Sequence, residues 1–345
     1  MVTLRQILSV GVVATSMALV TSLGAQATPV TVSFSFAGDT ELGNSPQVPT
    51  NPTSYMASVK SALAADVVFA NLEGTMTAGG TSKCAHPSSS CYAFKVPTSF
   101  AQAYKATGFT ILNSANNHSF DFGSAGAAST TAALHAAGIL QAGLRNQITY
   151  ERIGTVKVAV IGFAPYYNVN NFLLTSTARS LIQKAKANAQ LVIVYMHTGA
   201  EGPAATHVTK RTETFYGENR GNPYQFAHFA IDAGATAVIG SGPHVLRGME
   251  YYKGHLIAYS LGDFINYGNF AMVSPLNLSA ILKFTLAEDG TLQSAQFISL
   301  KLVGRGQASL DSSDASAHMV NALSRADFGA QAALINTDGS IALPG

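Results

Sequence analysis

The sequence is poor in charged residues. Only 11% of its 345 residues are Asp, Glu, Lys or Arg, and the formal net charge is +2. Because it has no long basic run, the chain has no electrostatic basis for binding nucleic acid, and we predict no such partner. Tryptophan is absent, which leaves any aromatic stacking to Tyr and Phe. Hydrophobic residues make up 47% of the chain, so uncharged polar residues must cover much of its surface.

Cysteine is also scarce, with Cys84 and Cys91 as the only two. They bracket the polar segment AHPSSS, which can close into a small ring in an oxidising compartment. We predict a disulfide, with two free thiols as the alternative. His86 between them does not complete the ligand spacing of a zinc knuckle.

One hydrophobic run stands apart at the N-terminus. Arg5 precedes the apolar residues 7–23, and Ala25-Gln26-Ala27 then matches a signal-peptidase site. We expect residues 1–27 to be a signal peptide cleaved near Ala27, with an uncleaved membrane anchor as the alternative. Residues 28–345 would then be exported, to the periplasm, the cell surface or the medium. No later run approaches the roughly 18 apolar residues of a spanning helix.

Short apolar segments alternate with helix-compatible ones along much of the remaining chain. We predict strands at 30–38, 66–73, 110–115, 157–165, 191–199 and 236–244, and helices at 52–64, 98–107, 123–137, 176–189 and 222–233. Apolar strands separated by helices are typical of an α/β domain with buried sheets. After residue 244 the pattern changes to two hairpins and a helix near 314–325. We predict a single domain over 28–345, with the late strands completing a second sheet.

Five predicted strands end in residues that bind metals or move protons. These ends are Gly38-Asp39-Thr40-Glu41, Asn71-Leu72-Glu73, Asn116-Asn117-His118, His197-Thr198-Gly199 and Gly242-Pro243-His244. Any one of them alone could be a simple turn or a hydrogen-bonded histidine. Because ligands of α/β sheets bind beyond the carboxyl ends of the strands, the coincidence favours a shared site.

The donors in this set are carboxylates, an amide oxygen and imidazoles. Without a thiolate they suit Mn, Fe or Zn, as one ion or two. A bridging carboxylate can hold two ions about 4 Å apart, an arrangement that acts on phosphorus esters. His118, beside a ligand Asn117, is placed to protonate a leaving oxygen. Asp121 is expected to cap the helix that begins near Gly123.

Three further polar residues are expected to contribute. Arg220 is predicted to clamp a phosphate or carboxylate of the substrate, with a surface ion pair to Glu218 as the alternative. Asp263 and Glu250 follow His244 in the sequence, and we expect them to support the ligands, Asp263 by orienting a histidine.

The segments that carry these residues resemble a known family. FAGDTELG, NLEGTMT, NSANNHSFDFG, VIVYMHTGAE and GSGPHVLRGMEYYKGHLIAYSLGDF are similar to the CapA family, which is linked to poly-γ-glutamate capsule synthesis. That family in turn resembles the calcineurin-like metallophosphoesterases. The resemblance covers residues 30–303 and implies a four-layer α/β/β/α sandwich with a metal site at one edge.

Position by position, the resemblance implies metal ligands at Asp39, Asn117, His197 and His244. His118 matches the adjacent catalytic histidine, and Glu73 stands where the phosphoesterases have a bridging aspartate. Two positions depart from the pattern. Glu41 replaces the histidine of Asp-x-His, and we expect it to be a metal ligand, with an orientation away from the site as the alternative. Gly242 replaces the first histidine of Gly-His-x-His and cannot coordinate through a side chain, which leaves one metal position short of ligands.

Two functions follow from these patterns. The first is an exported CapA-like protein of polyglutamate capsule or envelope-polymer biosynthesis, with a metal-dependent, phosphoesterase-like hydrolase site. The alternative is a non-catalytic component that binds, assembles or exports an anionic polymer. Expected partners are an anionic polymer or phosphoester substrate and membrane-bound synthase or export components. A metal-free ligand-binding protein is the third possibility, and it does not explain the five strand ends.

Overall fold

The computed structural model describes residues 1–2, 11, 30–84 and 91–344. The predicted signal-peptide cleavage site near Ala27 lies outside the described residues. Among the helices of the described part, none has the length and apolar character needed to cross a membrane.

The larger sheet is built around β1 (Thr31–Glu41). Its strands lie in the order β18-β17-β16-β1-β2-β5-β6, and β15 pairs with the end of β1. The pairs from β1 to β6 are parallel, whereas β16, β17 and β18 form an antiparallel ladder. The other strands are β2 (Val67–Leu72), β5 (Ile111–Asn113), β6 (Leu140–Ala142), β15 (Asp263–Asn266), β16 (Leu278–Ala287), β17 (Leu292–Val303) and β18 (Gln307–Leu310).

The second sheet has the order β13-β14-β12-β9-β8-β7. Its central strands are parallel, and the two edge strands are antiparallel to their neighbours. Its strands are β7 (Thr149–Ile153), β8 (Val156–Phe163), β9 (Leu191–His197), β12 (Ala237–Ser241), β13 (Met249–Tyr252) and β14 (His255–Ala258). Two small ribbons pair β3 (Thr75–Met76) with β4 (Lys95–Val96) and β10 (Glu213–Phe215) with β11 (Glu218–Gly221).

The C-terminal strands divide between the two sheets. The hairpin β13–β14 joins the second sheet, as predicted, but β16 pairs with β1 and extends the first. The prediction that all late strands complete the second sheet is therefore wrong. Alternating apolar residues do not say which sheet edge a strand will join, because that choice depends on contacts distant in the sequence.

The inner faces of the sheets pack against each other and form the central core. Side chains alternate along β1, so that Phe34 and Phe36 point to this core. They meet residues of the opposite sheet, and the ring centroids of Phe69 and Tyr195 lie 4.7 Å apart. The two sheets thus form a sandwich whose seam is filled by aromatic and β-branched side chains.

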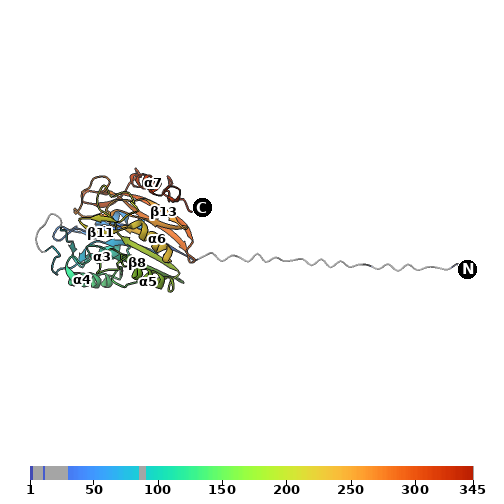
Figure 1. Cartoon of the computed structure of the whole chain (residues 1–345), viewed down its shortest axis with the longest axis horizontal. Coiled ribbons are helices and arrows are strands. Elements are labelled where there is room, and N and C mark those ends of the chain that lie inside the picture. The colour runs from blue at the N-terminus through green and yellow to red at the C-terminus, as the bar shows by residue number, and fades with distance from the viewer. Residues whose placement is uncertain (3–10, 12–29, 85–90, 345) are drawn as a thin grey trace.

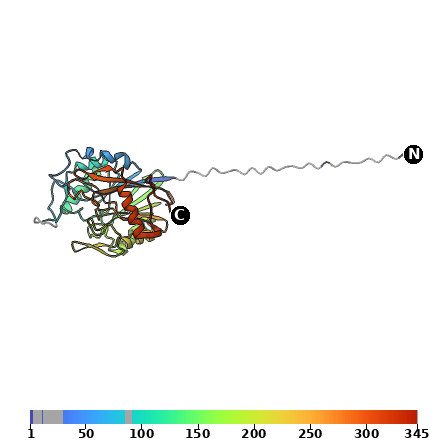
Figure 2. The same cartoon turned by 90° about the horizontal axis from the view of Figure 1, so that it is seen from above.

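Helices cover the outer faces of both sheets. The first sheet packs against α1 (Pro52–Tyr55), the turn Ala57–Val59, α2 (Lys60–Leu63), α3 (Phe100–Thr107) and α4 (Gly123–Ala136). The second packs against α5 (Thr175–Lys186) and α6 (Pro223–Ala233). Figure 1 shows α4 and α5 on one side of the molecule and α7 (Ala315–Phe328), followed by the turn Gly329–Gln331, on the other. In Figure 2 the blue N-terminal helices and the yellow α6 region lie on opposite sides of the sheets. The fold is the four-layer α/β/β/α sandwich expected from the resemblance.

Candidate metal centre

Asp39, at the end of β1, meets the second sheet at one end of the seam. Its Oδ1 lies 3.6 Å from Nδ1 of His197, the last residue of β9. Its Oδ2 accepts a hydrogen bond from the backbone N–H of Gly242 at 3.0 Å and lies 3.5 Å from Nδ1 of His244. Burial opposes ionisation, but the nearby imidazoles of His197 and His244 lower the pKa of Asp39 to about 2. Asp39 is therefore an anion held between the sheets.

Glu73 occupies the middle of three histidines. Its Oε1 lies 3.6, 3.8 and 3.9 Å from the Nε2 atoms of His197, His244 and His118. These separations exceed hydrogen-bonding distance, and this buried Oε1 has no hydrogen-bond partner among the described residues. Burial and the charge of Asp39 raise the pKa of Glu73 well above its usual value. A buried carboxylate oxygen facing three imidazole nitrogens has the donors and the space to take a cation.

The surrounding donors fall into three overlapping sets whose ligand atoms lie within 4.8 Å of one another. The sets are Asp39, Glu73 and His197; Asp39, His244 and Asp263; and Glu41, Glu73 and His244. Asn117 adds an amide oxygen, because its Oδ1 lies 3.0 Å from Nε2 of His197. Burial and the charge of Asp263 raise the pKa of Glu41, whose Oε1 also lacks a hydrogen-bond partner in the described structure. Nitrogen and oxygen donors without thiolate suit Mn, Fe or Zn, and the residues present fit a divalent ion.

Asn71 was not predicted to take part, yet it lies at the centre of the strand ends. Its Nδ2 donates to Asp39 Oδ1 at 2.8 Å. Its Oδ1 accepts hydrogen bonds from the side chains of Asn113 and Asn116, at 2.7 and 2.9 Å. Asn71 thereby fixes the rotamer of Asp39 and ties together β1, β2 and the turn after β5. Its only signal in the sequence was a polar residue at the end of an apolar strand.

His118 forms a dyad with Asp121, three residues later. Its Nδ1–H donates to Asp121 Oδ2 at 2.8 Å, which leaves Nε2 facing Glu73. Burial lowers the pKa of His118, although Asp121 opposes the change. The prediction that Asp121 caps a helix is wrong, because α4 begins without a side-chain cap. Asp121 is instead held by Lys83, whose Nζ lies 2.7 Å from Oδ1.

The disulfide loop supports this dyad from both of its arms. Cys84 and Cys91 are bonded, which confirms the predicted disulfide. Lys83, next to Cys84, pairs with Asp121, while the backbone N–H of Phe94 donates to Asp121 Oδ2 at 2.6 Å. Residues on either side of the disulfide therefore hold the carboxylate that orients His118.

Asp263 and Glu250 have different surroundings. Asp263 Oδ1 lies 2.8 Å from Nδ1 of His244, the orienting position that we expected. Glu250 is not in the centre, contrary to our prediction, because it accepts hydrogen bonds from Nε2 of His228, at 2.7 Å, and from the hydroxyl of Tyr259. Alternation along β13 is the reason: the residue before Glu250 faces the central core, so Glu250 points toward α6.

Arg220 makes an ion pair that the sequence did not predict. Its Nη1 lies 2.6 Å from Glu201 Oε1, while the anticipated partner Glu218 is 3.9 Å away. Glu201 Oε2 also lies 3.8 Å from Nε2 of His244, so this pair adjoins the centre. Burial alone would raise the pKa of Glu201, but the charges of His244 and Arg220 lower it. Nε and Nη2 of the buried Arg220 make no hydrogen bond with a described residue.

Together, the fold and the centre define a two-sheet α/β protein with a buried histidine–carboxylate cluster whose donors fit a divalent cation. The model of the bacterial capsule synthesis protein family PGA_cap matches residues 33–268. The chain belongs to this family, which confirms the resemblance drawn from the strand-end motifs.

Relatives in sequence include two capsule proteins of Bacillus. The chain is 31% identical over 212 residues to the capsule biosynthesis protein CapA of Bacillus anthracis, covering 55% of this chain and 47% of that protein. It is 29% identical over 204 residues to the PGA biosynthesis protein CapA of Bacillus subtilis strain 168, covering 54% and 50%. The chain thus spans about half the length of these relatives. A probable polyglutamine synthesis accessory protein of Mycobacterium tuberculosis is 27% identical over 271 residues, covering 69% and 67%.

Solved structures with a similar course of the chain include a nucleotidase and a phosphatase. A 5'-nucleotidase precursor from Thermus thermophilus aligns with a TM-score of 0.42 and 12% identity, covering 86% of this chain and 59% of that one. The purple acid phosphatase PPD1 from yellow lupin aligns with a TM-score of 0.36 and 10% identity, covering 79% and 52%.

Proposed function

We propose that this member of the capsule synthesis family is an exported, metal-dependent hydrolase of the phosphoesterase type that acts on an anionic envelope polymer or its phosphoester precursor. One observation carries the proposal. Glu73 Oε1 is buried without a hydrogen-bond partner among the described residues and faces Nε2 of His197, His244 and His118 at 3.6, 3.8 and 3.9 Å. Its raised pKa reflects the cost of burying this carboxylate, and a bound cation would offset that cost.

Two overlapping positions for ions share Glu73. The first position would use Asp39, Glu73 and His197 with Asn117, and the second Glu41, Glu73 and His244, whose Nδ1 is held by Asp263. Mn, Fe or Zn suits these donors. A divalent ion bound there supplies Lewis-acid polarisation of the ester and activation of water.

His118 is the group that moves the proton. Because Asp121 accepts its Nδ1–H, Nε2 is the atom that takes up a proton and passes it to the leaving oxygen. Asp121 keeps the ring in this tautomer and orientation. The Phe94 ring, with its centroid 4.6 Å from that of His118, covers one side of the imidazole and limits its contact with water.

Arg220 positions the anionic group of the substrate. Glu201 holds Nη1 and thereby fixes the plane of the guanidinium, while Nε and Nη2 keep their donor capacity. Two parallel N–H groups of arginine match two oxygens of a phosphate or carboxylate. A substrate with an acid group beside the scissile bond would therefore bind in a fixed orientation.

Export is supported by the disulfide as well as by the N-terminal hydrophobic run. Disulfides persist in oxidising compartments and are rare in the cytosol. A place outside the cytoplasm would bring the protein to the polymer and to membrane-bound synthase or export components.

The test compares His118→Ala with His135→Ala, a change at an exposed histidine of α4. We expect the purified protein to contain Mn, Fe or Zn and to hydrolyse a chromogenic phosphodiester when Mn is added. His118→Ala should retain its metal and lose turnover by about 10² to 10⁴, whereas His135→Ala should match the parent. A metal-free protein, or turnover equal in both variants, would refute the hydrolase proposal.

A second candidate, non-catalytic binding of an anionic polymer, is favoured by one specific contact. The backbone N–H of Gly242 donates to Asp39 Oδ2, at the position where the phosphoesterase pattern has a ligand histidine. A centre with one ligand fewer can still bind an ion and a polymer acid group without turnover. Metal binding without His118-dependent hydrolysis would select this candidate.

A further inference from the structure

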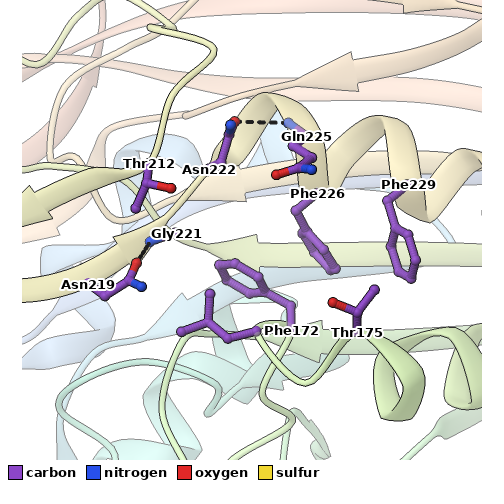
Figure 3. A pocket seen from close by; sticks show the side chains of 10 residues that line it. Phe172, Thr175, Thr212, Asn219, Gly221, Asn222, Gln225, Phe226 and Phe229 are labelled. Atoms are coloured by element: carbon purple, nitrogen blue, oxygen red, sulfur yellow. Dashed lines mark hydrogen bonds between the residues drawn. The ribbon is translucent and has the colours of Figure 1, made fainter.

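The N-terminal half of α6 borders two adjoining hollows outside the candidate metal centre. Their cavity volumes are about 180 and 550 Å³, and both are lined by Asn222, Gln225 and Phe229. We call these two hollows together the α6 groove. Figure 3 shows the first one, where the rings of Phe172, Phe226 and Phe229 lie between α6 and the start of α5.

Two cations lie over the aromatic floor of this groove. The guanidinium carbon of Arg179 is 4.5 Å from the ring centroid of Phe229, and Lys210 Nζ is 4.8 Å from that of Tyr224. Both side chains are exposed, and neither forms an ion pair with a carboxylate of the described residues. The acidic residue of the groove, Asp232, is neutralised by Lys253 Nζ at 2.6 Å. The groove therefore presents uncompensated positive charge above apolar rings.

Amide and hydroxyl groups complete the lining. Asn219 Oδ1 accepts from the backbone N–H of Gly221, which leaves its Nδ2 available (Figure 3). The side chains of Gln225, Thr175 and Thr212 make no hydrogen bond with any residue in the described part of the chain. Side-chain amides both donate and accept, so they complement a peptide-type amide, whereas a phosphodiester backbone has no donor to offer.

The groove adjoins the candidate metal centre through β11. Along this strand, Asn219 and Gly221 line the groove. Arg220 lies between them and, because side chains alternate along a strand, points to the other face, where it pairs with Glu201. A single strand thus separates the two sites, and an extended chain can pass from one to the other over a short distance.

From this geometry we propose that the α6 groove binds a segment of a carboxylate-bearing polyamide chain. Arg179 and Lys210 pair with its carboxylates, the aromatic floor packs against its methylene groups, and the amides of Gln225 and Asn219 bond its backbone. The inference rests on the proposed function for the chain that reaches the metal centre, but binding in the groove needs neither metal nor turnover.

The experiment measures binding of fluorescein-labelled polyglutamate to the purified, EDTA-treated protein by fluorescence anisotropy. The double variant Arg179→Gln/Lys210→Gln should bind about tenfold more weakly than the parent. Lys184→Gln, which removes one exposed charge from the same helix as Arg179, should stay within about twofold. His118→Ala should bind as the parent does, so loss of hydrolysis and loss of groove binding can be told apart.

Specificity is tested by competition with unlabelled polymers, and melting temperatures verify that every variant is folded. Polyglutamate should displace the label, and neutral dextran should not. Equal affinity of the parent and the double variant would overturn the proposal. Displacement by inorganic polyphosphate as effective as that by polyglutamate would also overturn it, because it would reduce the groove to a general anion site. Hydrolysis of the small chromogenic ester should be the same in the double variant and the parent.

Discussion

Two buried clusters in this protein pair a glutamate with histidine, and they differ in one respect. Glu250 Oε1 accepts hydrogen bonds from Nε2 of His228, at 2.7 Å, and from the hydroxyl of Tyr259. Glu73 Oε1 faces three imidazole nitrogens at 3.6 to 3.9 Å and bonds none of them. The exposed fractions of Glu250 and Glu73 are 3% and 2%, so burial does not distinguish the clusters. Hydrogen bonding distinguishes them. The hydrogen-bonded carboxylate of Glu250 stabilises the fold, whereas Oε1 of Glu73 has no such bond and is available to a ligand.

The largest expected effect comes from replacing the glutamate of each cluster with glutamine. Glu73→Gln should weaken Mn binding by at least about 100-fold, because it removes a bridging charge from both ion positions. Glu250→Gln, the matched change, should leave metal affinity within about twofold. Isothermal titration with Mn on both variants measures the difference, and equal affinities would remove the distinction drawn between the clusters.

Next in size is the effect of Asp121→Asn. The amide can no longer hold the Nδ1–H tautomer of His118 firmly, so kcat should fall by roughly 10²-fold with little change in KM. The alkaline limb of the pH–rate profile should move to lower pH, because the charge of Asp121 raises the pKa of His118 and the amide removes that charge, while bound metal stays the same. An unchanged pH profile with a uniform loss of stability would mean that Asp121 is only a structural residue.

Glu250→Gln should affect stability more than chemistry. Its Oε1 accepts from two buried donors, His228 and Tyr259, and the amide keeps one acceptor oxygen but loses the charge that strengthens both bonds. We expect a loss of about 1 to 3 kcal/mol in the free energy of unfolding. Urea titration followed by circular dichroism gives the value, and Glu73→Gln in metal-free protein should not show this loss, because its carboxylate makes no such bonds through Oε1.

The smallest effect concerns pH in the metal-free protein. Burial alone would lower the pKa of His244, but the charges of Glu73 and Asp263 raise this pKa well above 6.5 in the folded state. The stabilisation that protonated His244 gives the folded state is complete below pH 6.5, the pKa of histidine in the unfolded state. It is lost as pH rises through the pKa of His244 in the folded state. His118 and His197, whose folded pKa values are lowered, are neutral in both states above 6.5 and contribute no slope there. The melting temperature should therefore decline as pH rises above 6.5 and through the raised folded pKa of His244, and bound Mn should reverse the trend. A flat or rising melting temperature without metal would contradict this account.

The sequence predicted the α/β class and the ends of the strands that form the centre. Asp39, Glu73 and His197 could be found because chemistry-bearing side chains followed apolar runs, and parallel strands bring such positions to one edge. The departures at Glu41 and Gly242 were also visible. The Cys84–Cys91 bond was predicted from spacing and the expected compartment.

The errors share a physical cause, which is that partners distant in the sequence decide a side chain's role. Glu250 was placed in the centre because it is near His244 in the sequence, but the register of β13 turns it to the opposite face. Asp121 has the local pattern of a helix cap, and only the fold brings Lys83 and the backbone N–H of Phe94 to it. Asn71 and Glu201 carried no strong local signal, since their importance comes from contacts across strands.

The position of the centre on the seam has a mechanical consequence. Asp39 lies in β1 and Glu73 follows β2 of one sheet, whereas His197 ends β9 and His244 follows β12 of the other. Ions bound at these residues would therefore fasten the two sheets to each other. Metal affinity would then depend on how the two sheets are positioned relative to each other. A substitution deep in the seam that slides one sheet by a fraction of an ångström could empty the centre without touching a single ligand.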